Sequence, residues 1–302
     1  MKKFILNNKA VLLIVTLAIA GGAVPVFVKI ATQEIPPAPF TLLRFAFALV
    51  ILAPIFWAQK EKINFNKLKG AIIPSVFGAG NVILFAIGIR MASASSAQML
   101  YTTVPLLAGI FSYFLLQERL SKKKIAGIII GFSGALVIIM LPVITGQTSL
   151  DGNLTGNLII MSAVLSQALY SVFSKKSQKK CSPIFLTLSF AIATIVLQFP
   201  LVFAGLHDNI DALRHFSMIG FLCTAYVGIV GTGLWYLLYQ FVIKNASATI
   251  ASMTLYLQPV FTIVWAILLL NEKIGLGFFI GSCLAFAGIF LAANNRKETY
   301  GK

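Results

Sequence analysis

The sequence predicts an all-α integral membrane protein with ten transmembrane helices in two inverted five-helix repeats. Three observations lead to this fold class: the composition, the placement of the basic residues and an internal repeat. Hydrophobic residues make up 59% of the 302 residues and charged residues only 11%, against about 25% charged residues in soluble domains. With a mean hydropathy of +0.93, the chain is expected to lie in a lipid bilayer.

Apolar stretches long enough to cross a bilayer recur along the whole chain. About 20 apolar residues in a helix span a hydrocarbon core of roughly 30 Å, and a helix satisfies its own backbone polar groups there. The first stretch follows Lys2, Lys3 and Lys9 and so has features of a signal peptide, but its length and the need for a counterpart to the sixth stretch favour a retained helix. The expected spans are 10–30, 38–58, 70–90, 94–117, 124–143, 155–174, 183–205, 216–241, 246–270 and 274–293.

The basic residues are concentrated on one side of these spans, and this sets the expected orientation. Cytoplasmic connections of membrane proteins are enriched in Lys and Arg, so both termini are expected in the cytoplasm and the protein in the cell (plasma or inner) membrane. The net charge of +16 then reflects topology, and nucleic acid is not an expected partner. The residues assigned to the cytoplasmic side are Lys2, Lys3, Lys9, Lys60, Lys62, Lys67, Lys69, Arg119, Lys122, Lys123, Lys124, Lys175, Lys176, Lys179, Lys180, Lys244, Arg296, Lys297 and Lys302.

An internal repeat indicates how the spans are organised. The segment 92–134 overlays 246–288 without a gap at an offset of 154 residues, which indicates a duplicated unit. Because each half holds five spans, an odd number, the second half crosses the membrane in the opposite sense. Inverted repeats allow a site near the midplane to open to either side in turn, so the sequence predicts a transporter and not an enzyme. The paired residues include Pro105 with Pro259, Glu118 with Glu272, Gly127 with Gly281 and Gly134 with Gly288.

The same segments resemble the EamA domain of the drug/metabolite transporter superfamily. The resembling residues are Gly21–Lys29, Pro36-Pro37, Phe40–Phe45, Ser95–Ala97, Pro105, Glu118–Leu120, Gly127 and Gly134, with Gln167–Tyr170, Ser182-Pro183, Pro259, Glu272-Lys273, Gly281 and Gly288 in the second copy. The resemblance implies two EamA repeats, 1–145 and 146–302. It also implies a central cavity lined by spans 1–4 and 6–9, and carriage of small organic metabolites such as amino-acid-like solutes, or of drugs, commonly outward.

Arg44 is the charged residue deepest within an expected span. It lies about six residues inside the second span, roughly 9 Å below its outer boundary at 1.5 Å per residue, and the corresponding region of the seventh span has Leu188-Ser189 instead. A charge at this depth needs a partner or water. Arg44 is therefore either a cavity group for a carboxylate, with Lys29 and Arg90 adding positive potential, or a structural residue. In the structural role it snorkels outward, binds carbonyls at a helix end or pairs with Glu34.

Other polar and aromatic residues inside the spans are candidates for the cavity wall. Several occur three or four residues apart, which places them on one helical face. An apolar and aromatic pocket with a few polar groups suits a small amphipathic solute; interhelical hydrogen bonding and membrane-belt roles are the alternative. With Arg44, the candidates are Asn81, Gln98, Tyr101, Gln167, Tyr170, Trp235, Tyr239, Tyr256 and Gln258.

Proline and glycine mark positions where helices bend or approach closely. Pro25, Pro105 and Pro259 are candidates for hinges, with a static kink as the alternative. The fifth and tenth spans carry small-residue faces, which serve either packing within the monomer or a homodimer contact through these two spans. The glycines of these faces are Gly127, Gly131, Gly134, Gly277 and Gly281.

The sequence offers little support for chemistry or for proton coupling. The expected spans contain no Asp or Glu, the residues that usually relay protons in carriers. Glu118 and Glu272 each precede an expected helix, where the positive end of the helix dipole stabilises a carboxylate. We find no catalytic motif, cofactor motif or strong metal-site spacing; the cluster from His207 to His215 is interpreted as an exposed loop. The alternative function is a membrane-embedded lipid-modifying enzyme or a scaffold.

Overall fold

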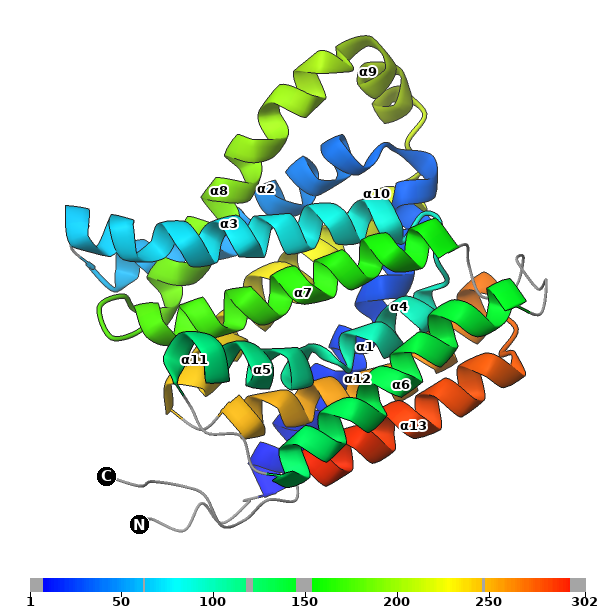
Figure 1. The fold of residues 1–302 in the computed structure, drawn as a ribbon. Helices are drawn as coiled ribbons and strands as arrows, with labels where there is room; N and C mark the ends of the chain where they lie inside the picture. The colour runs from blue at the N-terminus through cyan, green and yellow to red at the C-terminus, as the bar shows by residue number, and fades with distance from the viewer. Residues whose placement is uncertain (1–7, 62, 118–121, 145–153, 246–247, 294–302) are drawn as a thin grey trace.

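The computed structural model describes residues 8–61, 63–117, 122–144, 154–245 and 248–293, and every element in these ranges is a helix (Figure 1). The chain is therefore all-α, as the sequence predicts. The elements are α1 (Asn8–Glu34), α2 (Pro37–Ala58), α3 (Phe65–Gly88), α4 (Ala94–Tyr101), α5 (Val104–Leu116), α6 (Lys122–Ile144), α7 (Leu154–Ser177), α8 (Pro183–Ala204), α9 (Leu206–Arg214), α10 (Met218–Tyr226), the π-helix η1 (Val227–Leu234), α11 (Trp235–Asn245), α12 (Ala248–Leu270) and α13 (Leu276–Ala293).

Six helical segments in the described part of the chain are long and apolar enough to cross a membrane. They coincide with the expected spans 2, 3, 4, 6, 7 and 8, and shorter apolar helical stretches within α6, α12 and α13 coincide with spans 5, 9 and 10. The protein is thus a multi-pass membrane protein. The six segments are Pro37–Ala58, Phe65–Gly88, Ala94–Leu116, Leu154–Ser177, Pro183–Ala204 and Met218–Phe241.

Two of the expected spans are interrupted. The fourth divides into α4 and α5 at Thr102 and Thr103, whose hydroxyls donate to carbonyls three residues earlier at 2.6 and 2.7 Å, and Pro105 follows in the first turn of α5. The eighth contains η1, where the Thr232 hydroxyl donates 2.8 Å to the carbonyl of Val227, five residues earlier. By contrast, α1 and α12 continue through their internal prolines.

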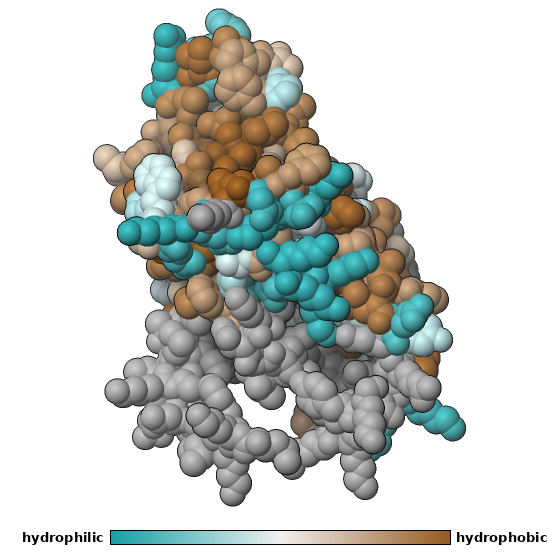
Figure 2. Space-filling view, turned by 90° about the vertical axis from the view of Figure 1, so that its left-hand side faces the viewer, coloured by the Kyte–Doolittle hydropathy of each residue, from teal (hydrophilic) through white to brown (hydrophobic). Residues whose placement is uncertain are grey.

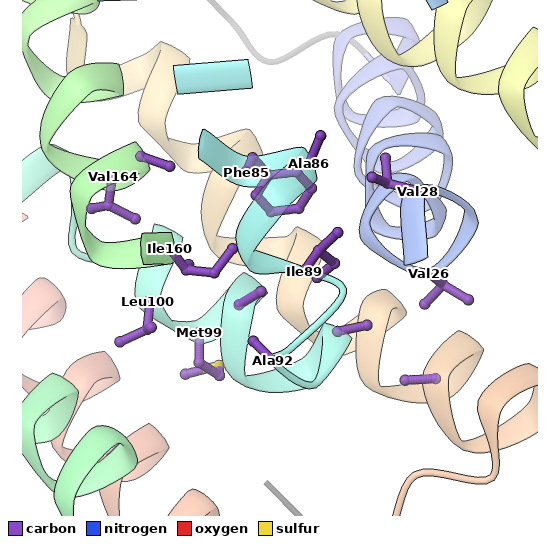
Figure 3. Packing of buried hydrophobic residues seen from close by; sticks show 14 of the residues in the cluster. Val26, Val28, Phe85, Ala86, Ile89, Ala92, Met99, Leu100, Ile160 and Val164 are labelled. Atoms are coloured by element: carbon purple, nitrogen blue, oxygen red, sulfur yellow. The ribbon is translucent and has the colours of Figure 1, made fainter. Parts of the chain in front are cut away.

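The helices pack in a bundle around two apolar clusters. In the bundle α1 packs against α12, α2 against α8 and η1, α3 against α7 and α8, and α6 against α13. Figure 3 shows part of the larger cluster, where Phe85 and Ile89 meet Ile160 and Met99 from neighbouring helices. Large apolar side chains also cover the outside, with Trp57, Phe114 and Phe290 more than 70% exposed. An apolar exterior over a packed interior is what a bilayer requires.

Two lysine-rich connections lie together at one end of the molecule. The α2–α3 connection and the α7–α8 connection are joined by the Ser177 hydroxyl, which donates 2.6 Å to the carbonyl of Gly70, and by Ser182, which donates to Glu61. This end faces the viewer in Figure 2, where a hydrophilic band crosses the apolar surface. The positive-inside pattern predicts that these two connections share a side of the membrane.

The small-residue faces of α6 and α13 pack against each other within the monomer. A Cβ atom added at Gly288 would lie 2.3 Å from the Gly131 nitrogen, and one added at Gly134 would lie 2.5 Å from the Ala285 nitrogen. Backbone meets backbone at these points, so glycine is required for the close approach. Gly134 and Gly288 therefore serve packing within the monomer, and the homodimer contact stays a prediction.

We predict that Gly288→Ala destabilises the protein, because the new methyl group meets backbone atoms that cannot turn aside. Overpacking of this kind costs about 1–3 kcal/mol, measurable as a lower melting temperature of the detergent-purified protein. Gly70→Ala is the control, since its added Cβ would lie 3.4 Å from the Cys181 sulfur, an ordinary contact. Equal melting temperatures for the two variants would contradict the packing argument.

A second prediction concerns Glu61 at the lysine-rich end. Burial raises the pKa of this carboxyl, but hydrogen bonds from Lys67 and Ser182 and the charge of Lys67 outweigh burial, so the pKa is lowered. A lowered folded-state pKa adds stability above the unfolded-state value that is lost as the pH falls through the folded-state pKa. Glu61→Gln should therefore lower the melting temperature at pH 7, and the difference from wild type should shrink on acidification. A pH-independent difference would contradict the charge argument.

Candidate functional site

A cavity lies between helices of both halves of the chain. Its volume is about 80 Å³, which is small beside the roughly 300–1,000 Å³ typical of sites for drug-sized ligands. Its wall combines apolar and aromatic side chains with a few polar ones. The lining residues are Gly21, Val24, Pro25, Arg44, Asn81, Val82, Phe85, Gln98, Tyr101, Val104, Gln167, Gly231, Trp235, Tyr236 and Gln258.

Arg44 enters this cavity from α2 and is anchored by the π-helix. Its side chain is 3% exposed, and its Nε donates 2.6 Å to the Thr232 hydroxyl, which in turn donates to the carbonyl of Val227. The contact requires glycine, because a Cβ at Gly228 would lie 2.4 Å from the Arg44 carbonyl oxygen. Tight helix packing therefore fixes the position of the guanidinium group.

Arg44 has no carboxylate partner among the described residues. Each ion pair found in those ranges involves other groups, and Glu34 accepts instead from the backbone nitrogen and hydroxyl of Ser217, at 2.9 and 2.8 Å. The expected alternative of an Arg44–Glu34 pair is therefore wrong. Burying an unpaired charge is costly, so an anionic group in the cavity would find a cation already in place.

Asn81 links the two tyrosines of the cavity wall. Its Nδ2 donates 2.5 Å to the Tyr101 hydroxyl and 2.9 Å to the carbonyl of Ala163, while its Oδ1 accepts from the Tyr236 hydroxyl at 3.2 Å. The Phe85 ring packs edge-on against Tyr101, with the ring centroids 5.3 Å apart. These contacts hold the polar ends of both tyrosines in fixed positions.

Three glutamines supply further polar groups. The Gln98 amide donates to the Oε1 of Gln258 at a long 3.4 Å, and the two side chains are 5% exposed. Gln167 also lines the cavity, and its Oε1 is buried without a hydrogen-bond partner in the described part of the chain. A buried amide oxygen without a partner costs free energy, which a hydrogen-bonding ligand could recover.

The structure brings most of the expected cavity residues together, but not all. Tyr170 and Tyr239 do not line the cavity: Tyr170 accepts from Gln240 at 2.7 Å, and Tyr239 lies 3.3 Å from the Ser171 hydroxyl and stacks on Trp235. The side chain of Tyr256 lies outside the described residues. Of the hinge candidates, Pro25 lines the cavity and Pro105 and Pro259 do not.

Lys29 and Glu272 form a separate contact away from the guanidinium of Arg44. Lys29 donates 2.8 Å to the carbonyl of Ala92 and pairs with Glu272 at 3.4 Å. Glu272 accepts from the backbone nitrogens of Ala94 and Ser95 at 2.7 and 3.1 Å, so it caps α4. The expectation that Glu272 caps the helix that follows it is corrected, because the capped amides come from the other half of the chain. Glu118 lies outside the described residues.

Tyr236 and Thr232 are site residues that the sequence analysis missed. Tyr236 adjoins Trp235, and a regular α-helix with Trp235 and Tyr239 on one face turns Tyr236 aside. In the structure Trp235 and Tyr236 both lie in the first turn of α11, directly after the π-helix, and both line the cavity. No spacing in the sequence marks Thr232, because its contact depends on the π-helix, a feature that often accompanies functional sites.

The cavity, its buried cation and the apolar helices around it define a multi-pass membrane transporter. The model of the EamA-like transporter family matches residues 8–140 and again residues 154–294. The chain belongs to this family, and the resemblance seen in the sequence is confirmed.

Curated relatives cover nearly the whole chain. An uncharacterized transporter of Bacillus subtilis (strain 168), YoaV, is 27% identical over 286 residues, which is 94% of this chain and 96% of the relative. A protein of Escherichia coli (strain K12) named a probable amino-acid metabolite efflux pump is 26% identical over 300 residues, 95% of each chain. A solved crystal structure with 19% identity superposes with a TM-score of 0.64 over 93% of this chain and 95% of the other, which shows a shared fold.

We predict that Thr232→Val destabilises the protein by about 1–3 kcal/mol, because the Nε of Arg44 loses its acceptor while buried. Thr194→Val is the matched control: Thr194 is equally buried, but its hydroxyl bonds only to the carbonyl of Phe190 in its own helix. Chemical or thermal unfolding of the purified proteins compares the two. A larger loss for Thr194→Val would show that Arg44 does not depend on this hydroxyl.

Proposed function

We propose that this protein is a secondary transporter that moves small organic solutes carrying a carboxylate across the cell membrane by alternating access. The observation that carries the proposal is Arg44, a buried arginine at the cavity wall without a carboxylate partner in the described ranges. A solute carboxylate would supply the missing charge and could accept two hydrogen bonds from the guanidinium. The apolar and aromatic side chains of the wall suit the remainder of amino-acid-like solutes and of drugs of this kind.

The pattern of helix neighbours supports two inverted repeats, 1–145 and 146–302. Suppose that spans 1–5 correspond in order to spans 6–10. The contact between α3 and α7 then corresponds to the contact of α1 with α10 and η1. In the same way, the contact between α1 and α12 corresponds to the contact of α7 with α4 and α5. The packing of α3 on α8 likewise matches that of η1 on α2, and the pairs α2–α8 and α6–α13 join corresponding spans. A two-fold arrangement of this kind is the basis of alternating access in ten-span carriers.

Export is the direction we propose, with both termini in the cytoplasm. The lysine-rich connections gathered at one end support that orientation, and the relative named as an efflux pump supports the direction. The expected spans contain no acidic residue, so we infer facilitated diffusion or exchange as the mode of transport.

The test is counterflow in liposomes containing the purified protein and a panel of carboxylate-bearing and neutral solutes. Arg44→Ala should reduce counterflow of carboxylates by at least about tenfold, because a hydrogen-bonded charge pair is worth about 1.5–3 kcal/mol. Arg214→Ala is the control, since its side chain is 73% exposed. No flux of any solute, with lipid turnover instead, would favour a membrane-embedded enzyme, and equal loss for neutral solutes would assign Arg44 a structural role.

A further inference from the structure

The direction of the hydrogen bonds around Asn81 is fixed by a backbone carbonyl. The carbonyl oxygen of Ala163 can only accept, so the Asn81 atom 2.9 Å from it must be the amide nitrogen. The second hydrogen of that nitrogen points to the Tyr101 hydroxyl at 2.5 Å. The amide oxygen is then left for the Tyr236 hydroxyl at 3.2 Å. The usual ambiguity between the two ends of an amide is therefore removed.

This arrangement gives the two tyrosines opposite hydrogen-bonding roles toward the cavity. Tyr101 accepts from Asn81, so its own O–H proton is available for another acceptor. Tyr236 donates its proton to Asn81, so its oxygen keeps only lone pairs for another partner. Both side chains line the same cavity as Arg44. The wall therefore presents a cation and a donor beside an acceptor.

We propose that Asn81 acts as a positioning residue that makes the cavity selective for solutes with both a carboxylate and an adjacent N–H donor, as in a zwitterionic α-amino acid. Arg44 and the Tyr101 hydroxyl bind the carboxylate, and the Tyr236 oxygen accepts from the ammonium group. The proposal rests on the proposed transport function, and it adds a requirement for the second group of the solute.

Gln167 provides a second acceptor for the same group. Its side-chain amide lines the cavity, is 3% exposed and has no partner for its Oε1 in the described part of the chain. The last side-chain bond of glutamine turns freely, so the amide oxygen can rotate toward a bound N–H donor. A simple carboxylic acid would leave both this oxygen and that of Tyr236 unsatisfied.

The experiment measures dissociation constants by titration calorimetry on the full-length purified protein. The probes are two matched pairs, phenylalanine with 3-phenylpropanoate and leucine with 4-methylpentanoate, which differ only in the ammonium group. In each pair that binds, the amino acid should bind at least about tenfold more tightly, the value of one hydrogen bond to a charged group. Equal or tighter binding of the deamino acids would overturn the proposal.

Single substitutions distinguish the roles of Tyr101 and Tyr236 in binding. Tyr236→Phe should remove most of the preference for the amino acid, whereas Tyr101→Phe should weaken both members of a pair and leave their ratio unchanged. Asn81→Leu should bring the ratio close to one, because both hydroxyls become free to turn. Tyr239→Phe is the control: Tyr239 lies one turn further along the same helix, its hydroxyl faces Ser171, and the residue does not line the cavity.

The ratio of the two constants distinguishes selectivity from general damage, since misfolding weakens both probes alike. If Asn81→Leu does not fold, Tyr236→Phe alone decides: equal weakening of both probes would overturn the proposal. Binding of both probes that depends on Arg44 but shows no preference would overturn this inference and leave the proposed function standing. If Arg44→Ala changes the binding of neither probe, the proposed function fails with it.

Discussion

The chain of hydrogen bonds from Arg44 through Thr232 to the carbonyl of Val227 is the interaction on which the site depends. It needs a helix that can place a hydroxyl beside α2, and the π-helix with Gly228 permits that approach. Because one nitrogen of the guanidinium is held in this way, the charge is positioned by the protein before a solute arrives. Preorganised groups of this kind lower the cost of binding.

The bundle contains two kinds of helix contact, one through backbone atoms and one through polar side chains. Between α6 and α13 the contact is backbone against backbone, and Gly134 and Gly288 exclude side chains. Around the cavity Gly228 also permits a close approach to the Arg44 backbone, but there polar side chains such as Asn81 and Gln98 lie between the helices. In a bilayer no water is available to satisfy polar groups at the lipid surface, so they gather where the helices leave space.

The sequence predicted the fold class and part of the cavity for one physical reason. A polar side chain in an apolar span must turn toward protein, and Arg44, Asn81 and Gln167 were found by that rule. Tyr170 was misplaced because a spacing of three residues from Gln167 shows a shared helical face but not which neighbour that face meets. The role of Thr232 depends on a local change of helical register, and the partners of Glu272 come from the other half of the chain. The spacing of residues in the sequence encodes neither.

The Glu272 side chain connects the second half of the chain to two helices of the first half. One carboxylate of the second half accepts from two amides at the start of α4 and pairs with Lys29 of α1, and its side chain is only 9% exposed. The three contacts share one carboxylate, so displacement of the Glu272 side chain breaks all of them. One side chain of the second half therefore holds both α1 and the start of α4, and dissolved salt has little access to weaken these contacts.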